Sequence, residues 1–368
     1  MGKIYQNLLI VAGIIIALFL AWYFRNIVAY LMISAVLALV GKPIVEFLCK
    51  IRIRERKLPR WLCVSAALGT IMSILYLFLS FFIPLIVSHT QALANMNISD
   101  IVSLLTEPFI QLEKVINTAF PDSKFSINAL LSNEIISIFD SSAILEYFGS
   151  ITDFIVSMAI AIFSISFITF FFMKEESLFI DGVVILFPAQ YESGIRHAWN
   201  NSTKLLMRYF IGVFFDMICV MIVLTIGLKF VVGLNFGTAI LLGFISGILN
   251  VIPYVGPLIS AIIGIVVTTA NIGVGVIPAD MGYPGIFFKV LGVFIAMKIL
   301  DDTVFQPYIF ANSIKAHPLE IFLLILIAGS FAGVAGMLIA IPTYTVLRVF
   351  AKEFFNRFRV VQKLTERI

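Results

Sequence analysis

The stretch Asn250-Val-Ile-Pro-Tyr-Val-Gly-Pro257 interrupts a region that is otherwise almost continuously apolar from Leu234 to Arg348. Pro253 and Pro257 remove backbone donors, so a regular helix cannot run smoothly through this stretch. Inside lipid, broken helix is tolerated only where protein or a water-filled cavity covers the freed backbone groups. The stretch therefore predicts a discontinuous membrane helix, which is the usual construction of a transport site.

Further interruptions follow in the same region. They are Asp301-Asp302 with Gln306-Pro307, the dipeptide His317-Pro318, and the glycines Gly329, Gly333 and Gly336, with Pro342 just beyond. The segment Leu319–Val349 is too long for one straight span, and its glycines favour packing or a turn over ligand contact. We expect this segment, the Asn250–Pro257 break, or both, to form a helical hairpin.

The composition excludes a large soluble core. Hydrophobic residues make up 61% of the chain and charged residues only 12%, whereas a soluble domain has about 25% charged residues. We predict an all-α, polytopic helical membrane protein with about eight spans of roughly 20 residues each. The candidate spans are Leu8–Phe24, Ile27–Leu48, Trp61–Val87, Ile151–Met173, Tyr209–Val232, Phe236–Ile252, Tyr254–Thr269, Gly285–Leu300 and Leu319–Val349.

Charge sets the expected orientation in the membrane. The loop Lys50–Arg60 carries six basic residues against Glu55, which places it in the cytoplasm. We expect a tight turn at Arg25-Asn26 between the first two spans, and the N-terminus is then cytoplasmic as well, because two spans separate it from this loop. The tail 350–368 is also basic. The insertion 88–150 has seven acidic residues against two lysines, which fits the outer side.

These features divide the chain into six parts. They are the N-terminal spans (1–87), an extracytoplasmic helical insertion (88–150), a span (151–173), a cytoplasmic amphipathic linker (174–208), a C-terminal transport core (209–349) and a cytoplasmic tail (350–368). The insertion carries an apolar stripe from Ile101 to Ile116 at helical spacing. That stripe needs a partner, either the protein's own spans or another subunit, and we expect a homo-oligomer.

Several chemistries find no support in the sequence. It contains no H-E-x-x-H motif, no phosphate-binding loop and no G-x-S-x-G elbow, so we expect no enzyme, no cofactor and no metal site. The net charge of +4 gives no reason to expect nucleic acid. Because Cys49, Cys63 and Cys219 all lie outside the insertion, we expect no disulfide framework.

The acidic pair Asp301-Asp302 is the sharpest candidate for chemistry. A carboxylate at the bilayer centre costs roughly 2.5–3.5 kcal/mol, so it normally faces a cavity or a cation. Neighbours on a helix point about 100° apart, so we expect only one of the two to face the interior. Alternatively, Lys298 pairs with Asp302 four residues on, close to a membrane surface.

The remaining candidates each have a simpler reading. The break offers Asn250, Pro253, Gly256 and Pro257. Its two prolines free the carbonyls of Leu249 and Pro253, which could ligate an ion or bond to a substrate; the alternative is a proline-kinked turn between two helices. His317 could shuttle protons near neutral pH, or could simply cap a helix. Asp216 lies within an apolar span, where an interhelical hydrogen bond is the simpler role.

The C-terminal motifs resemble the autoinducer-2 exporter (AI-2E) family of permease-like bacterial membrane proteins. The matching elements are Arg208-Tyr-Phe-Ile-Gly212, the Asn250–Pro257 break, Asp301-Asp-Thr-Val-Phe-Gln-Pro307, His317-Pro-Leu319 and the glycine-containing run from Ala328 to Pro342. Family members commonly have Asn after the aspartate, whereas this chain has Asp302, which adds a carboxylate.

The resemblance implies a secondary transporter in a bacterial inner membrane, with the lipid bilayer and a small molecule or ion as its partners. The first hypothesis is export of a small polar metabolite or an autoinducer-2-like signal. The second is a monovalent cation/proton antiporter, coupled to protons or sodium. A third, from a different class, is an oligomeric scaffold without transport.

The charge distribution predicts that both termini and the Lys50–Arg60 loop are cytoplasmic and that 88–150 is outside. On a background lacking the native cysteines, we expect Ser132→Cys to react with a membrane-impermeant thiol reagent in intact cells. Labelling of Ser132→Cys only after permeabilisation would reverse this orientation.

Overall fold

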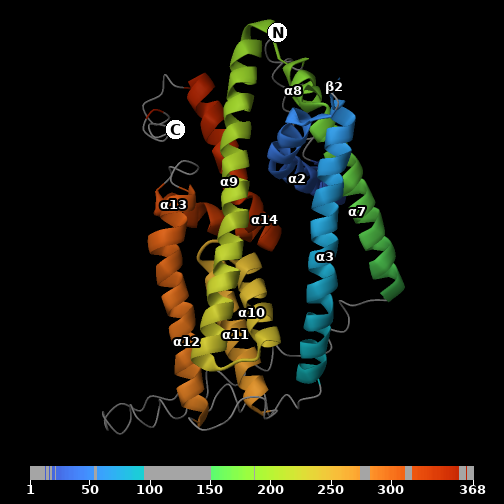
Figure 1. The fold of residues 1–368 in the computed structure, drawn as a ribbon. Coiled ribbons are helices and arrows are strands. Elements are labelled where there is room, and N and C mark those ends of the chain that lie inside the picture. Colours follow the sequence, from blue (N-terminus) through green and yellow to red (C-terminus); the bar gives the residue numbers. More distant parts are fainter. Residues whose placement is uncertain are drawn as a thin grey trace. The chain divides into compact units, whose positions relative to one another are not determined.

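The computed structural model describes residues 22–53, 56–94, 151–185, 187–273, 282–310 and 317–355, with a few single positions outside these ranges. This part of the chain is almost entirely helical, as predicted (Figure 1). The helices are α2 (Arg25–Lys50), α3 (Arg60–Ala94), α7 (Ile151–Lys174), α8 (Glu176–Ile185), α9 (Glu192–Gly227), α10 (Phe236–Leu249), α11 (Val255–Gly273), α12 (Gly282–Leu300), α13 (Gln306–Phe310) and α14 (Pro318–Phe355).

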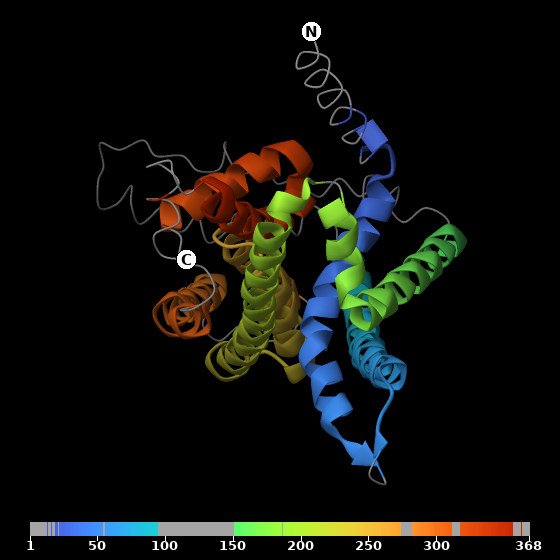
Figure 2. The ribbon, with the colours of Figure 1, turned by 90° about the horizontal axis from the view of Figure 1, so that it is seen from above.

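Shorter elements join these helices. They are the strands β1 (Arg52–Ile53) and β2 (Arg56–Lys57), the 3₁₀ turn η1 (Ala189–Tyr191), and the π-helical segments η2 (Leu228–Val232) and η3 (Asp301–Phe305). The strands pair antiparallel and form the hairpin at the end of α2, which Figure 2 shows in blue.

Five of the described helical stretches are long and apolar enough to cross a membrane. They are Arg25–Lys50, Arg60–Leu85, Ser157–Lys174, Ala189–Val232 and Leu319–Phe355. The helix α10 has only 14 residues, a length of about 21 Å against a hydrocarbon core of about 30 Å. A polytopic helical membrane protein is therefore confirmed, while the number of about eight spans stays a prediction. Most of the insertion 88–150 and the end of the tail lie outside the described residues.

The described residues cluster into two compact units, one from Met1–Ile74 with Phe148–Trp199 and the other from Leu75–Tyr147 with Asn200–Ile368. In the first unit, α2 packs against α7. The buried Ser34 hydroxyl donates to the carbonyl of Ile165 at 3.1 Å, an interhelical hydrogen bond of the kind that joins spans in lipid.

The first unit also corrects one expectation and bears on another. No tight turn forms at Arg25-Asn26, because helical hydrogen bonds run from Phe24 N to Leu20 O and from Val28 N to Phe24 O. In addition, the predicted boundary at 208 between linker and span lies inside one helix, so the division itself stays a prediction. The helix α9 begins at Glu192 and continues without interruption into the predicted span for 36 residues. At the first place, beside Arg25-Asn26, Phe24 departs from helical geometry (φ −94°, ψ 31°), but helical hydrogen bonds continue on both sides of it.

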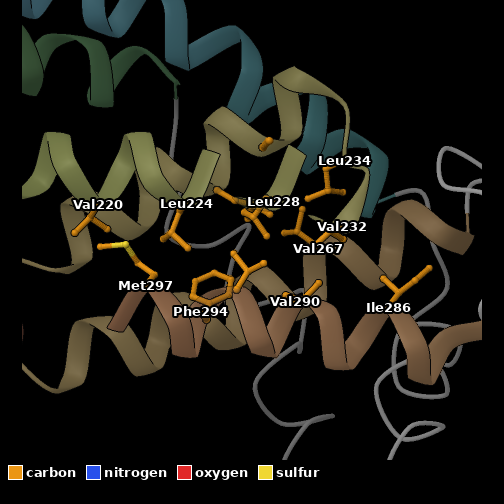
Figure 3. Packing of buried hydrophobic residues seen from close by; sticks show 13 residues of the cluster. Val220, Leu224, Leu228, Val232, Leu234, Val267, Ile286, Val290, Phe294 and Met297 are labelled. Carbon is orange, nitrogen blue, oxygen red and sulfur yellow. The ribbon is translucent and has the colours of Figure 1, made fainter. Parts of the chain in front are cut away.

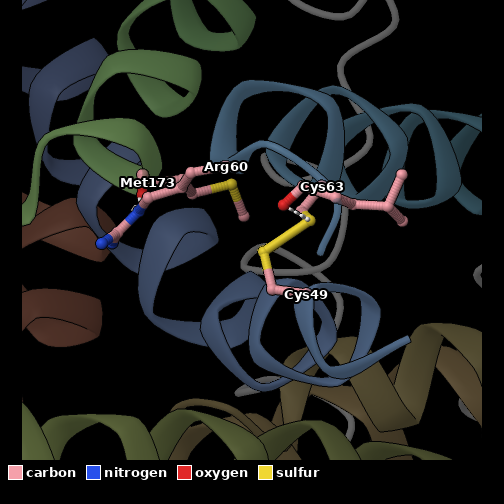
Figure 4. Close-up of a disulfide and its surroundings, with 5 residues drawn as sticks. Cys49, Arg60, Cys63 and Met173 are labelled. Carbon is pink, nitrogen blue, oxygen red and sulfur yellow. Dashed lines mark hydrogen bonds between the residues drawn. A yellow bond between two sulfur atoms is a disulfide. The ribbon is translucent and has the colours of Figure 1, made fainter. Parts of the chain in front are cut away.

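The expectation that the cysteines stay unpaired is wrong. Cys49 at the end of α2 and Cys63 at the start of α3 form a disulfide (Figure 4). The β1–β2 hairpin reverses the chain between them and brings their Cα atoms to 5.6 Å, within the range that a disulfide spans. In the same place, Arg60 Nη2 donates to the Met173 carbonyl at 3.2 Å and so caps the end of α7. The expectation rested on the position of the cysteines outside the insertion and took no account of this reversal.

In the same unit, an ion pair connects α8 and α9 within the described part of the linker. Arg196 of α9 donates to Asp181 of α8 at 2.8 Å and to Glu192 at 2.9 Å. The hydrogen bond from the Arg196 guanidinium holds the pKa of the Asp181 carboxyl below its ordinary value. Because both partners are solvent-exposed, the pair fixes the angle between the two helices more than it adds stability.

The second unit is built around α9, α10, α11 and α12. Side chains of α9 and η2, such as Leu224 and Leu228, face Val290 and Phe294 of α12 in one buried apolar cluster (Figure 3). In lipid such helices associate through close packing, because burial from water no longer drives them together.

Small residues bring α10 against α9. A Cβ added at Gly243 or Gly247 would lie 2.6 Å from the carbonyl oxygen of Met221 or Met217, respectively. The spacing of four residues places both glycines on one face, so the two backbones touch along that line. This close approach places the end of α10 beside the middle of α9.

The helix α14 folds back on itself, as its length and its glycines predicted. Ala332 and Gly333 leave helical geometry, and Gly333 has φ +57°, which glycine adopts without strain. Tyr344 hydrogen-bonds Glu320 at 2.9 Å, although 24 residues separate them. A straight helix would hold them about 36 Å apart. The hairpin thus has a first arm, 318–331, and a second arm, 334–355.

Packing of α10 on α9 supplies a stability test. We expect Gly247→Leu to lower the unfolding temperature of the detergent-solubilised protein, because the new side chain collides with the backbone of Met217. Overpacking of this kind costs about 1–3 kcal/mol. The control is Gly292→Ala in α12, where an added Cβ meets nothing within 4 Å. Equal unfolding temperatures for the two variants would contradict the close approach of α9 and α10.

Candidate functional site

The acidic pair lies where α12 gives way to a π-helical segment. The segment η3 begins at Asp301 and ends at Phe305, directly after Leu300. In an α-helix, residues five apart point about 140° away from each other. The wider π turn brings such residues onto one face, and Gln306 Nε2 donates to Asp301 Oδ2 at 2.8 Å. Single π turns inside helices are frequent at functional sites.

Asp301 and Asp302 have different surroundings, as their spacing on a helix predicted. Asp301 is 1% exposed, whereas the Asp302 side chain is 51% exposed. Lys298 Nζ bridges them, at 3.3 Å from Asp301 Oδ2 and 2.6 Å from Asp302 Oδ1. The expected pairing of Lys298 with Asp302 is therefore present, and the same ammonium also forms an ion pair with the buried Asp301.

Asp216 joins this site from α9. Its side chain is 4% exposed and lies within hydrogen-bonding reach of Asp301. Asn250, the residue that ends α10 and begins the break, donates from Nδ2 to Asp216 Oδ2 at 2.7 Å. Three elements distant in sequence thus converge on two buried carboxylates.

The other oxygen of each carboxylate is buried and has no hydrogen-bond partner in the described part of the chain. These atoms are Asp216 Oδ1 and Asp301 Oδ1. Ionised carboxylates only accept hydrogen bonds, so the two can bond to each other only if one carries a proton. Lys298 lies at ion-pair distance from Asp301 but is shared with Asp302, so one ammonium faces three carboxylates and the two buried negative charges are not fully compensated. The arrangement therefore suits one exchangeable proton or one bound cation.

The break itself is a tight turn with a strained residue. Tyr254 has φ +67°, which is uncommon for a residue other than glycine. The carbonyls of Leu249 and Pro253, expected from the sequence to be free, accept hydrogen bonds from Ile252 N at 3.0 Å and Val255 N at 2.8 Å. They are thus used within the turn.

Gly256 and Pro257 allow α11 to start beside the end of α10. A Cβ at Gly256 would collide with the carbonyl of Leu249, so only glycine fits this position. The carbonyl of Pro257 accepts from the Ser260 hydroxyl at 2.9 Å. Asn250 is the residue of the break that hydrogen-bonds a carboxylate, Asp216. Pro253, Gly256 and Pro257 shape the turn that holds Asn250 in this position.

The other predicted site residues lie elsewhere. His317 is exposed and its Nδ1 accepts from Leu319 N at 3.2 Å, the capping contact at the start of α14, where Pro318 is the first residue. Pro307 is exposed in the first turn of α13. The glycines shape the α14 hairpin: a Cβ at Gly336 would collide with the carbonyl of Ala328, and one at Gly329 would meet Met337.

Comparison with known proteins agrees with this architecture. The sequence model of the family described as "AI-2E family transporter" matches residues 11–356, so the chain belongs to this family. It is 24% identical to "Putative transport protein YueF" of Bacillus subtilis strain 168, over 92% of this chain and 85% of that protein.

Two further relatives carry similar names. "Putative transport protein YrrI" of the same organism is 29% identical over 52% of this chain and 51% of its own length. A "Putative transport protein" of Haemophilus influenzae is 23% identical over 94% of this chain and 92% of its own length. Family and architecture together identify a multi-pass membrane transporter.

The contact between Asn250 and Asp216 supplies a test that does not depend on the substrate. We expect Asn250→Ala to lower the unfolding temperature more at alkaline than at acidic pH, because an ionised Asp216 then loses its donor. A buried group left without its partner costs about 1–3 kcal/mol, and protonation at acidic pH removes part of that cost. Thermal unfolding in detergent at both pH values measures the difference.

Ser260→Ala is the matched control, since it also removes a buried hydrogen bond but from a neutral pair. Its effect should not change with pH. A pH-independent loss in Asn250→Ala would show that the amide does not stabilise a charged carboxylate.

Proposed function

We propose that this chain is a secondary transporter driven by exchange of a proton and a monovalent cation at the Asp216–Asp301 pair. The observation that carries the proposal is the pair of buried carboxylate oxygens, Asp216 Oδ1 and Asp301 Oδ1, with no hydrogen-bond partner among the described residues. Ionisable groups inside a membrane protein mark ion pathways and proton relays. Two carboxylate oxygens supply part of the oxygen ligands that a small cation takes.

Exchange at the pair conserves charge. When a sodium or lithium ion enters, the proton shared by Asp216 and Asp301 leaves. The two carboxylates together with their bound proton or ion therefore carry the same total charge before and after. The amides of Asn250 and Gln306 already hold the Oδ2 atoms at 2.7 and 2.8 Å, respectively. The Oδ1 atoms are thereby held in place for the incoming ion without a large rearrangement.

Lys298 gives the site a third possible occupant. Its ammonium lies 3.3 Å from Asp301 and 2.6 Å from Asp302 on a flexible side chain. As a tethered cation already in contact with Asp301 Oδ2, it can shift from Asp302 fully onto Asp301 when the transported ion leaves. Asp302, which is half exposed, holds Lys298 at the rim of the site in the meantime.

The nature of the cargo separates two forms of the proposal. In the first, the monovalent cation is itself the cargo and the protein is a cation/proton antiporter, which the carboxylate pair favours. In the second, the exchange drives export of a small polar metabolite or an autoinducer-2-like signal, which the family description favours.

We propose that the protein lies in a bacterial inner membrane, as a homo-oligomer with both termini in the cytoplasm. If the reconstituted wild-type protein shows no flux, the protein is an oligomeric scaffold without transport.

Flux measurements in proteoliposomes test the proposal. Under an imposed proton gradient, we expect Asp216→Asn and Asp301→Asn to insert and assemble but to lose coupled flux of sodium or lithium. Asp302→Asn is the matched control, because it removes an adjacent carboxylate that is exposed. It should retain most of the flux. Wild-type flux in both Asp216→Asn and Asp301→Asn would reduce the buried pair to a structural role.

The same vesicles identify the cargo and the role of Lys298. Uptake of labelled autoinducer-2 that depends on the gradient and on Asp301 would favour the second form of the proposal. We expect Lys298→Ala to shift the pH dependence of flux while the protein still folds, because the competing tethered cation is gone. An unchanged pH profile would exclude Lys298 as an occupant of the site.

A further inference from the structure

The hairpin of α14 carries a second polar group that the carboxylate site does not use. Glu320 lies at the start of the first arm, and Tyr344 and Arg348 lie on the second arm. Tyr344 Oη donates to Glu320 Oε2 at 2.9 Å, and the Arg348 guanidinium lies 5.5 Å from the centre of the Tyr344 ring. Tyr344 and Arg348 are four residues apart and therefore share one helix face.

This group is costly to keep in an apolar hairpin. Arg348 is 8% exposed, and Glu320 and Tyr344 are half-buried. Apolar contacts between the arms lie beside it, with Ile325 packed in the same cluster as Ala340 and Ile341. A hydrogen bond that joins the arms across such a surface has a defined geometry, which apolar packing does not provide by itself.

The first arm also touches the break that presents Asn250. The Phe322 ring meets the Tyr254 ring edge-on at 5.5 Å. Ile321, Leu324 and Ile325 pack in one cluster with Ile252 and Val255. Contacts therefore run without a gap from the Glu320–Tyr344 bond through the first arm to the turn, and from the turn through Asn250 to Asp216.

We propose that the Glu320–Tyr344 hydrogen bond positions the first arm of α14 against the Asn250–Val255 turn and so sets the rate of ion exchange at Asp216. This inference rests on the proposed function and adds positioning residues to it. The arm pivots at Ala332–Gly333, where the backbone already leaves helical geometry. With the bond made, the arm supports the turn; with the bond broken, the arm moves away from it.

Tyr344→Phe is the sharpest variant, because it removes only the hydroxyl and leaves the ring beside Arg348. Thr345→Val is its matched control, since it removes the neighbouring hydroxyl, which bonds within its own helix to Ile341 O. We expect Tyr344→Phe to lower the maximal flux about fivefold, the equivalent of one hydrogen bond, with little change in the half-saturating cation concentration. Thr345→Val should transport like the wild type.

Substitutions of Glu320 separate the hydrogen bond from charge. Glu320→Gln keeps an acceptor for Tyr344 and should retain most of the flux, whereas Glu320→Ala should match Tyr344→Phe. The double variant Glu320→Ala/Tyr344→Phe should be no slower than either single variant. Equal losses in Glu320→Gln and Glu320→Ala would assign the effect to charge and overturn the proposal.

A distance measurement keeps the test independent of transport. Spin labels at Leu319 and Leu347, one exposed position on each arm, should give a broader distance distribution in Tyr344→Phe than in the wild type or Thr345→Val. Unchanged arm distances in Tyr344→Phe overturn the positioning role. Absence of coupled flux in the wild type instead overturns the proposed transport function. The distance measurement and the flux measurement thus distinguish failure of the positioning role from failure of the proposed function.

Discussion

The burial of two carboxylates, Asp216 and Asp301, is the constraint on which the described architecture of the C-terminal half depends. A buried charge is tolerated only with a partner, a proton or a bound ion. Each carboxylate has one oxygen held by an amide and one with no hydrogen-bond partner among the described residues. The proposed exchange of a proton and a cation takes place at the two oxygens that have no such partner.

The irregular backbone features serve this pair. The π turn at η3 places Gln306 over Asp301, and the break after α10 presents Asn250 to Asp216. The glycine face of α10 allows the backbone of α9 to come close enough for that second contact. In lipid, each departure from regular helix leaves backbone groups that protein must satisfy, so such features persist where they position something. Here they position amide donors.

Much of this was predictable from the sequence. The length of Leu319–Val349 and its glycines predicted the hairpin, because one span needs only about 20 residues and glycine permits a reversal of the chain. The angle between helix neighbours predicted that only one residue of Asp301-Asp302 faces inward. His317 was open to a functional or a capping role, and the structure shows the capping contact.

Other features depend on contacts that no local pattern encodes. Asp216 had no sequence neighbour to mark it as the partner of Asp301, although an aspartate within so apolar a span was a signal. The π turn has no compositional signature, and only the antiparallel β1–β2 pairing brings Cys49 to Cys63. The helical hydrogen bonds across Arg25-Asn26 likewise override a locally polar dipeptide.

Infrared difference spectroscopy of the reconstituted protein, with and without sodium, tests most directly whether the buried pair holds an exchangeable proton. The expected result is a protonated carboxyl band that disappears when sodium is added. The band should persist in Asp302→Asn and be absent from the difference spectra of Asp216→Asn and Asp301→Asn. A wild-type spectrum without a sodium-sensitive carboxyl band, or a band unchanged in both buried-aspartate variants, would contradict proton–cation exchange at this pair.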